Sequence, residues 1–239
     1  MKSNEIGNKA EVDRMIKNLN REGNLPFIEG YYYHIYSQPN SSNEINNEIK
    51  FSQFERKFIR DLNVYFHLYA YCLLPDHFHF LGQVKGNPQK NLASIQNLKD
   101  LRKLQNSMLN KHINKKLSAW YRTFIQLSSG KAAGKMPLKQ KMHTEIIDKE
   151  LYFSDLIFHI HYNPVYHNIY QSYQTYPWSS YKYFLNGKRT PIKKKAVLQY
   201  FSGKQYFIQF HEEKEQSFAQ LNQKYKNGMK SNISEIAQR

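Results

Sequence analysis

The stretch FHLYAYCLLPDHFHFLGQV, residues 66–84, decides the fold class. Residues 66–74 carry apolar side chains at both alternating sets of positions, which is typical of a strand in the middle of a sheet. Pro75-Asp76 predicts a turn, and residues 77–84 predict another strand that pairs with the first as a hairpin. Because alternate residues of a strand share a face, we expect His77 and His79 to project together, opposite Phe78.

Further helix and strand signals flank this hairpin. Residues 31–36 are rich in strand formers, and apolar residues recur at helical spacing over 51–62 and 91–127. A last helix is predicted over 149–162, ending near Asn163-Pro164, because proline disfavours helix in the residue before it. The order strand, helix, strand, strand, helix, loop, helix predicts an α+β fold, in which helices pack on one face of an antiparallel sheet.

The composition favours a folded protein with an acidic partner. Lys and Arg number 35 against 19 Asp and Glu, so the formal net charge is +16, and aromatic residues make up 15% of the 239 residues. This aromatic content excludes a disordered polar chain. The charge favours nucleic acid as the partner, with an acidic membrane surface as the second possibility.

The chain carries no signal for a membrane or an oxidising compartment. No apolar run approaches the roughly 20 residues that cross a bilayer, and the N-terminus, with Glu5 and Asp13 among its lysines, does not resemble a signal peptide. The single cysteine, Cys72, excludes a disulfide framework. We therefore expect a cytoplasmic protein with no membrane association.

By composition the chain divides into three parts. Residues 1–25 are polar and form a variable N-terminal segment. Residues 26–185 hold most of the aromatic and apolar runs and form the main domain. Residues 186–239 begin with a predicted turn at Asn186-Gly187 and form a basic C-terminal extension.

Positive charge is concentrated between Lys99 and Lys141, where eleven Lys or Arg residues accompany one acid, Asp100. One interpretation is a solvated helix face. The run also carries aromatic residues such as Trp120, and cations beside aromatics are typical of single-stranded nucleic-acid binding. The candidate DNA-binding residues are Arg102, Lys103, Lys111, Lys115, Lys116, Tyr121, Arg122, Lys131, Lys135, Lys139 and Lys141.

Two histidine-containing motifs are candidates for a metal site. The neutral imidazoles of His77 and His79 on one strand face either form half of a divalent-metal site or are surface histidines of an amphipathic strand. His159 and Asn163 lie four residues apart on one face of the last predicted helix, where the Asn163 oxygen could complete the site. Alternatively, Asn163 is a helix stop signal. Two histidines and one asparagine would accept Mg²⁺, Mn²⁺ or Zn²⁺.

These motifs together resemble one family. LLPDHFHF (residues 73–80), a basic helix, HYNPVYHN (161–168) and YPWSSY (176–181) occur in the order found in the IS200-like superfamily of tyrosine (HUH) transposases. The segments VLQYFSGK (197–204) and FIQFH (207–211) also match. The resemblance extends over most of the chain and is strongest to the REP-associated branch.

The resemblance implies a fold, a reaction and a partner. It implies a ferredoxin-like α+β domain in which His77, His79 and Asn163 bind Mg²⁺ or Mn²⁺. In that family the metal polarises a phosphate of single-stranded DNA, and a tyrosine hydroxyl attacks it to give a covalent 5′-phosphotyrosine and a free 3′-OH. Basic surfaces recognise hairpin DNA, and relatives act as monomers or dimers, so a homodimer is possible here too.

The sequence departs from the family at the nucleophile, because His159 stands where the family has its tyrosine. Three hypotheses follow. The protein is an active transposase that uses another nucleophile, a decayed or domesticated relative that binds hairpin DNA without cutting it, or a hydrolase that has a histidine nucleophile or depends on a metal. The tyrosines that could replace the missing nucleophile are Tyr121, Tyr152, Tyr162 and Tyr166.

Overall fold

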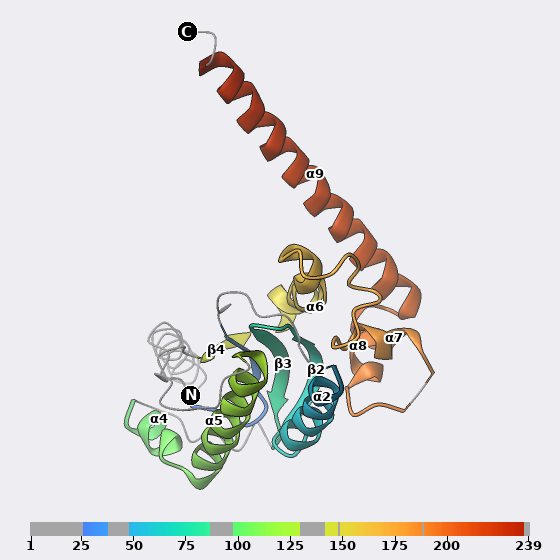
Figure 1. The fold of residues 1–239 in the computed structure, drawn as a ribbon. Helices are drawn as coiled ribbons and strands as arrows, with labels where there is room; N and C mark the ends of the chain where they lie inside the picture. The colour runs from blue at the N-terminus through green and yellow to red at the C-terminus, as the bar shows by residue number, and fades with distance from the viewer. Residues whose placement is uncertain are drawn as a thin grey trace, which may run out of the picture. The chain divides into compact units, whose positions relative to one another are not determined.

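The computed structural model describes residues 26–37, 48–86, 98–129, 142–147, 149–187 and 189–236. It divides into two units, Met1–Lys194 and Lys195–Arg239, each of which is considered by itself. Figure 1 shows the elements, which in chain order are β1 (Tyr32–Ser37), α2 (Glu48–Leu62), β2 (Phe66–Leu73), β3 (Phe78–Val84), α4 (Leu98–Gln105), α5 (Met108–Ser129), β4 (Met142–Ile147), α6 (Lys149–Tyr166), α7 (Tyr181–Leu185), α8 (Lys194–Tyr200) and α9 (Lys204–Ile236).

The four strands of the first unit form one antiparallel sheet in the order β2-β3-β1-β4. With α2 between β1 and β2, and α4 and α5 between β3 and β4, this is the βαββαβ arrangement of ferredoxin-like folds. The predicted α+β class and the β2–β3 hairpin are confirmed. Strand β4 was not predicted from the sequence, because its six residues lie between a basic loop and a helix signal.

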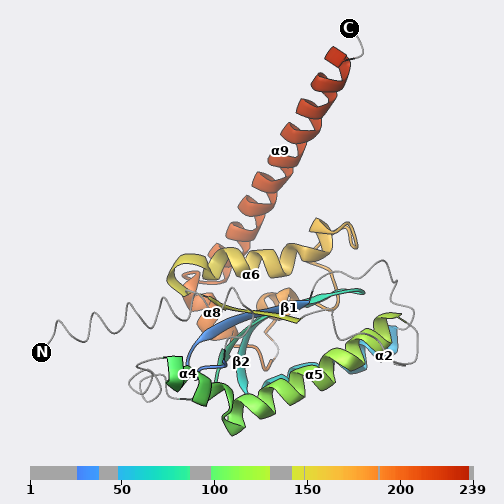
Figure 2. The same cartoon turned by 90° about the vertical axis from the view of Figure 1, so that its left-hand side faces the viewer.

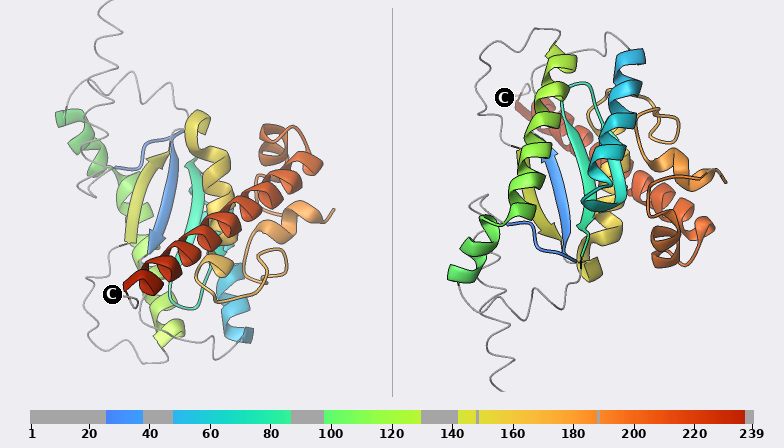
Figure 3. Two further views of the ribbon diagram at one scale, coloured as in Figure 1. Left: turned by 90° about the horizontal axis from the view of Figure 1, so that it is seen from above. Right: turned by 90° about the horizontal axis from the view of Figure 1, so that it is seen from below.

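Helices α2 and α5 cover one face of the sheet, as predicted for the helices of this fold (Figure 3). Phe78 contacts Trp120 of α5 with ring centroids 4.3 Å apart, and Phe80 contacts Phe58 of α2 at 5.6 Å. All four side chains are buried. Burial of such rings contributes roughly 2–3 kcal/mol each, so this aromatic face forms the main core.

Helix α6 covers the opposite face of the sheet (Figure 2). Its Phe153 contacts the rings of Tyr69 on β2 and Tyr32 on β1, with centroids 5.5 and 5.8 Å apart. The expectation of helices on a single face therefore describes α2 and α5 but not α6. The physical reason is that β2 carries apolar residues on both faces, with Tyr69 on the side of α6, and therefore needs cover on each.

Two predicted helix boundaries need correction. The helix predicted over 91–127 is two helices in its described part, because Ser107 caps the start of α5 by accepting a 3.3 Å hydrogen bond from the Asn110 backbone N–H. Helix α6 runs one turn past Asn163 to Tyr166, with Pro164 inside it. Proline removes one main-chain hydrogen bond and crowds the carbonyl oxygen of the preceding turn, but the helix continues through it and ends where Asn168 adopts φ 55°.

The outer edge of β2 is covered by the chain after α6. Leu73 and Ser180 donate backbone hydrogen bonds to Trp178 and Tyr71, at 2.9 Å each. Such cover keeps an edge strand from pairing with other chains. In the second unit, Phe207 of α9 contacts the ring of Phe201 at 5.2 Å. No helix in the described part of the chain is both long and apolar enough to span a membrane.

Candidate functional site

Strands β1 and β3 place histidines on the face of the sheet that α6 covers. Tyr36 of β1 pairs with His79 of β3, and His34 shares the face of Tyr36 because it lies two residues earlier. A hydrogen bond of 3.0 Å joins His34 Nε2 and His79 Nδ1. The rings of His77 and His79 lie 5.3 Å apart, which confirms that these two side chains project together.

His77 lies in the turn before β3, where two polar neighbours fix its ring. Its Nδ1 donates to Asp76 Oδ1 across 2.6 Å, so Nε2 has a free lone pair when the ring carries a single proton. That Nε2 faces Asn163 Oδ1 at 3.4 Å, while Asn163 Nδ2 donates to the His159 carbonyl oxygen at 2.8 Å. Two hydrogen-bond acceptors thus face each other, an arrangement that a cation or an additional proton between them would stabilise.

The ring contacts extend to a group of five side chains, here named the histidine cluster: His34, His77, His79, His159 and His167. The His77 ring lies 4.6 Å from that of His167, and the His79 ring lies 5.5 Å from that of His159. The first three are buried, whereas His159 is exposed at the rim. The structure therefore brings His77, His79, Asn163 and His159, the residues predicted from sequence, to one place.

Burial keeps the imidazoles of His34 and His79 uncharged near neutral pH. It lowers the pKa of His34 to about 3, with a smaller contribution from His159. It also lowers the pKa of His79 well below its ordinary value, and the neighbouring His34 and His77 add to that effect. Partial loss of hydration at the rim, together with the neighbouring His77, also lowers the pKa values of His159 and His167. Neutral imidazoles are the form that binds metals.

The geometry at His77 and Asn163 is compatible with a divalent cation bound between them, with the His79 ring beside them. Two ligand atoms at roughly 2.1 Å from one cation are about 3.0–3.4 Å apart, and the separation of His77 Nε2 and Asn163 Oδ1 falls in that range. Within the described residues, no three His, Cys, Asp or Glu side chains are arranged to hold a metal ion. A cation here would therefore depend on the Asn163 oxygen as its third protein ligand.

Sequence reasoning missed a second group of residues beside the cluster. The Tyr36 ring stacks on those of His79 and His143, with centroids 5.5 and 5.0 Å apart. Its hydroxyl donates to Glu145 Oε1 at 2.8 Å, and burial together with Glu145 raises the pKa of Tyr36 to about 12. The alternation in sequence indicates that His34 and Tyr36 lie on the same face of β1. Their contacts with residues of β3 and β4 follow only from the pairing of these strands, which the sequence does not reveal.

The predicted DNA-binding residues fall into three groups. Arg102, Lys103, Lys111, Lys115, Lys116 and Arg122 are exposed on α4 and α5, and they are named here the basic surface. Tyr121 is buried and contacts Phe78, with ring centroids 6.1 Å apart, so its ring cannot stack on a base. Trp120 is likewise part of the core. Lys131, Lys135, Lys139 and Lys141 lie outside the described residues.

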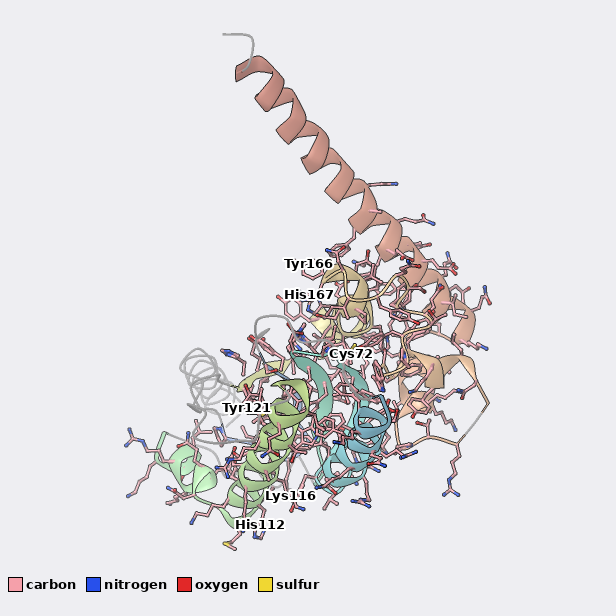
Figure 4. All side chains as sticks on the ribbon, in the orientation of Figure 1. Cys72, His112, Lys116, Tyr121, Tyr166 and His167 are labelled. Atoms are coloured by element: carbon pink, nitrogen blue, oxygen red, sulfur yellow. The ribbon has the colours of Figure 1, made fainter. Side chains whose placement is uncertain are left out.

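The basic surface and the histidine cluster lie on opposite sides of the sheet. Figure 4 shows Lys116 and His112 on α5, and Tyr166 and His167 at the end of α6, with the strands between them. This separation follows from the topology, because α5 covers the aromatic face and α6 covers the other. DNA that contacts both places would have to pass around an edge of the sheet.

Comparisons with known proteins give one structural likeness. No family model and no curated protein matches this chain. One solved structure, described as a REP-associated tyrosine transposase bound to a REP hairpin, is similar to this chain. The matched region covers 69% of this chain and 86% of the other chain, with 13% sequence identity and a TM-score of 0.46. A likeness at that level assigns neither family nor function, so the family resemblance in the sequence stays a prediction.

Proposed function

We propose that this protein binds single-stranded or hairpin DNA and cuts a phosphodiester bond beside a divalent cation, Mg²⁺ or Mn²⁺, held by His77, His79 and Asn163. The observation that carries this proposal is the pair of acceptors, His77 Nε2 and Asn163 Oδ1, that face each other at 3.4 Å. A bound cation would act as a Lewis acid on the phosphate oxygens.

Two neighbouring side chains prepare the proposed ligands. Asp76 fixes Nδ1 of His77, so that Nε2 points to Asn163. For Nε2 of His79 to bind a cation, its Nδ1 must carry the hydrogen and donate it to His34 Nε2, which lies 3.0 Å away. Partners of this kind set the tautomer and direction of a metal-binding histidine.

The basic surface supplies the proposed contacts to DNA. Its six cations are exposed, and one ion pair, Lys103 Nζ to Asp100 at 3.5 Å, offsets part of that charge. Exposed Lys and Arg side chains on adjacent helices contact phosphates without selecting a sequence. The surface is therefore suited to positioning a DNA backbone.

Binding without cutting is the second candidate function. The chemistry of His159 does not favour it as the nucleophile, because attack on phosphorus by an imidazole gives a phosphoramidate, which is labile. The exposed cations of the basic surface would still bind DNA if no side chain could attack. The two candidates share the partner and differ in whether a covalent intermediate forms.

Cation binding is tested first, by titrating Mn²⁺ into the metal-free protein at pH 7.5 and following the heat and the electron paramagnetic resonance signal. We expect one site, which His77→Ala and Asn163→Ala abolish. His112→Ala is the matched control, because His112 is an exposed histidine of α5 away from the cluster. Equal Mn²⁺ affinity in all four proteins would refute the metal site.

Cutting is tested with end-labelled hairpin and single-stranded DNA, with and without Mn²⁺. A covalent protein–DNA product that requires Mn²⁺ and is lost in His77→Ala supports the enzyme. Salt-dependent binding of the same DNA with no product would support the binding protein instead. Absence of both binding and product would overturn the proposal in either form.

A further inference from the structure

Three of the four tyrosines that could replace the missing nucleophile are in the wrong place. Tyr121 is buried on the aromatic face, on the far side of the sheet. Tyr162 is 9% exposed and stacks on Phe158, with ring centroids 5.0 Å apart. Tyr152 is exposed, but it lies in the first turn of α6, more than two helical turns before Asn163.

Tyr166 is at the rim of the histidine cluster. It is the last residue of α6, seven positions after His159 and three after Asn163, so these side chains lie on one face of the helix. Its ring centroid lies 6.4 Å from that of His159 and 5.0 Å from that of His167, whose ring in turn contacts His77. Figure 4 shows Tyr166 and His167 together at this end of α6.

The Tyr166 side chain also has the freedom that an attacking group needs. It is 54% exposed, and within the described residues its hydroxyl has no hydrogen-bond partner. Helix α6 ends directly after it, because Asn168 has a positive φ. The side chain can therefore change rotamer without breaking a contact of the core.

Tyr36 is the competing tyrosine, since its ring stacks on His79. Its hydroxyl, however, already donates a hydrogen bond to Glu145 at 2.8 Å, and its ring stacks on the rings of His79 and His143. To attack a phosphate, Tyr36 would have to leave both the carboxylate and the stack. The structure favours Tyr166 over Tyr36 on these grounds.

We propose that Tyr166 supplies the attacking hydroxyl, an inference that rests on the proposed DNA-cutting function. The Tyr166 Oη forms a bond to phosphorus as the bond from phosphorus to the 3′ oxygen breaks. The electron pair leaves on that oxygen, which gains a proton, and the phenolic proton passes to the solvent that Tyr166 faces. The products are a phosphotyrosyl 5′ end and a free 3′-OH, with no net change in oxidation state.

The test is to locate the covalent bond and remove the hydroxyl. Labelled hairpin DNA is incubated with Mn²⁺ and the wild-type protein, Tyr166→Phe, Tyr36→Phe or the control Tyr152→Phe, which removes an equally exposed hydroxyl from the same helix. We expect Tyr166→Phe to reduce the product by at least roughly 10³-fold, as for loss of a nucleophile, and Tyr152→Phe to leave it unchanged. Peptide mass mapping should find the nucleotide on Tyr166.

Each outcome separates this inference from the proposed function. Product that persists in Tyr166→Phe, or maps to Tyr36 or His159, overturns the inference and leaves the DNA-cutting function standing. An acid-labile bond would mark His159, because phosphoramidates hydrolyse in acid whereas phosphotyrosine survives. If the wild-type protein binds Mn²⁺ and DNA but forms no product, both the inference and the cutting function are wrong. If Mn²⁺ binding also fails, the metal site itself is refuted.

Discussion

The two faces of the sheet are built from the same strands but differ in what they bury. Phe78 and Phe80 point from β3 to α2 and α5, where they contact other aromatic rings. His79, between them in sequence, points to α6 and is hydrogen bonded to His34. Alternation along a strand thus separates an apolar face that stabilises the fold from a polar face that is available for chemistry.

The difference between the faces is also energetic. Burying an aromatic ring removes apolar surface from water and stabilises the folded state. Burying an imidazole keeps it neutral, so that lower pH works against the folded state. The low pKa of His34, about 3, reflects the unfavourable free energy of placing a charged imidazole in this buried position. We therefore expect stability to depend mainly on the aromatic face, and metal binding and pH dependence on the histidine cluster.

The largest expected effect is the loss of a ring from the aromatic face. Phe80 is fully buried and contacts Phe58 and Phe66, so Phe80→Ala should lower the free energy of unfolding by about 3–5 kcal/mol. Val64→Ala, at an exposed position, is the control and should change it by less than about 0.5 kcal/mol. Denaturant titration at pH 7.5 measures both. Similar losses in the two variants would show that this face is not the core.

The sequence predicted most of this fold because the hairpin over 66–84 alternates clearly and its turn is short. It did not predict β4, or the cover that α6 gives to the second face, because both depend on contacts far apart in the chain. Helix α6 continues past Asn163 because its packing on the sheet offsets the lost hydrogen bond and the steric clash of a single proline. Such tertiary contacts leave no local pattern to read.

The candidate site was predicted only in part for a similar reason. His77, His79, Asn163 and His159 came from two motifs, which the fold brings together. His34 and Glu145 could not be found from spacing, because the register that pairs β1 with β3 and β4 selects them. The sequence also could not show that the basic surface and the histidine cluster lie on opposite sides of the sheet.

The next largest effect concerns pH. The pKa of His34 is about 3 in the folded protein and near its ordinary value of about 6.5 when unfolded. Above pH 6.5 the ring is neutral in both states; as pH falls toward 3, the unfolded chain takes up a proton that the folded protein does not, so stability decreases. Between pH 7 and 4 this amounts to about 2–3 kcal/mol for the metal-free protein.

The pH effect is measured as the free energy of unfolding at several pH values for the wild-type protein and for His34→Asn. We expect the slope to be smaller in His34→Asn, whatever the absolute stability of that variant. His112→Asn, which removes an exposed histidine, should keep the wild-type slope. A slope that is the same in all three proteins would show that buried His34 does not stay neutral.

A smaller effect is expected at the residue that fixes His77. Asp76→Ala removes the acceptor of His77 Nδ1 and should weaken Mn²⁺ binding about tenfold. Asp76→Asn should weaken it less, because an amide oxygen can still accept that hydrogen bond. Calorimetric titration compares both with Asp61→Ala, a control at the end of α2. If Asp76→Ala and Asp61→Ala bind Mn²⁺ alike, Asp76 does not orient the ligand.

The smallest expected effect is on DNA affinity and concerns a single cation of the basic surface. If Lys115 contacts one phosphate, Lys115→Ala should reduce the slope of log affinity against log salt by about 0.7–0.9. Between 50 and 200 mM salt, one such contact accounts for about a threefold change in affinity. Fluorescence anisotropy with a labelled hairpin at several salt concentrations measures the slope.

Lys57→Ala on α2 is the matched control for this measurement, because it removes the same charge from another exposed helical position on the same side of the sheet. A local phosphate contact predicts that only Lys115→Ala changes the slope. Equal changes in both variants would mean that the net charge of +16 attracts DNA as a diffuse field, with no dedicated surface on α5. In that case the protein would not have one side of the sheet for binding DNA and the other, with the histidine cluster, for the reaction.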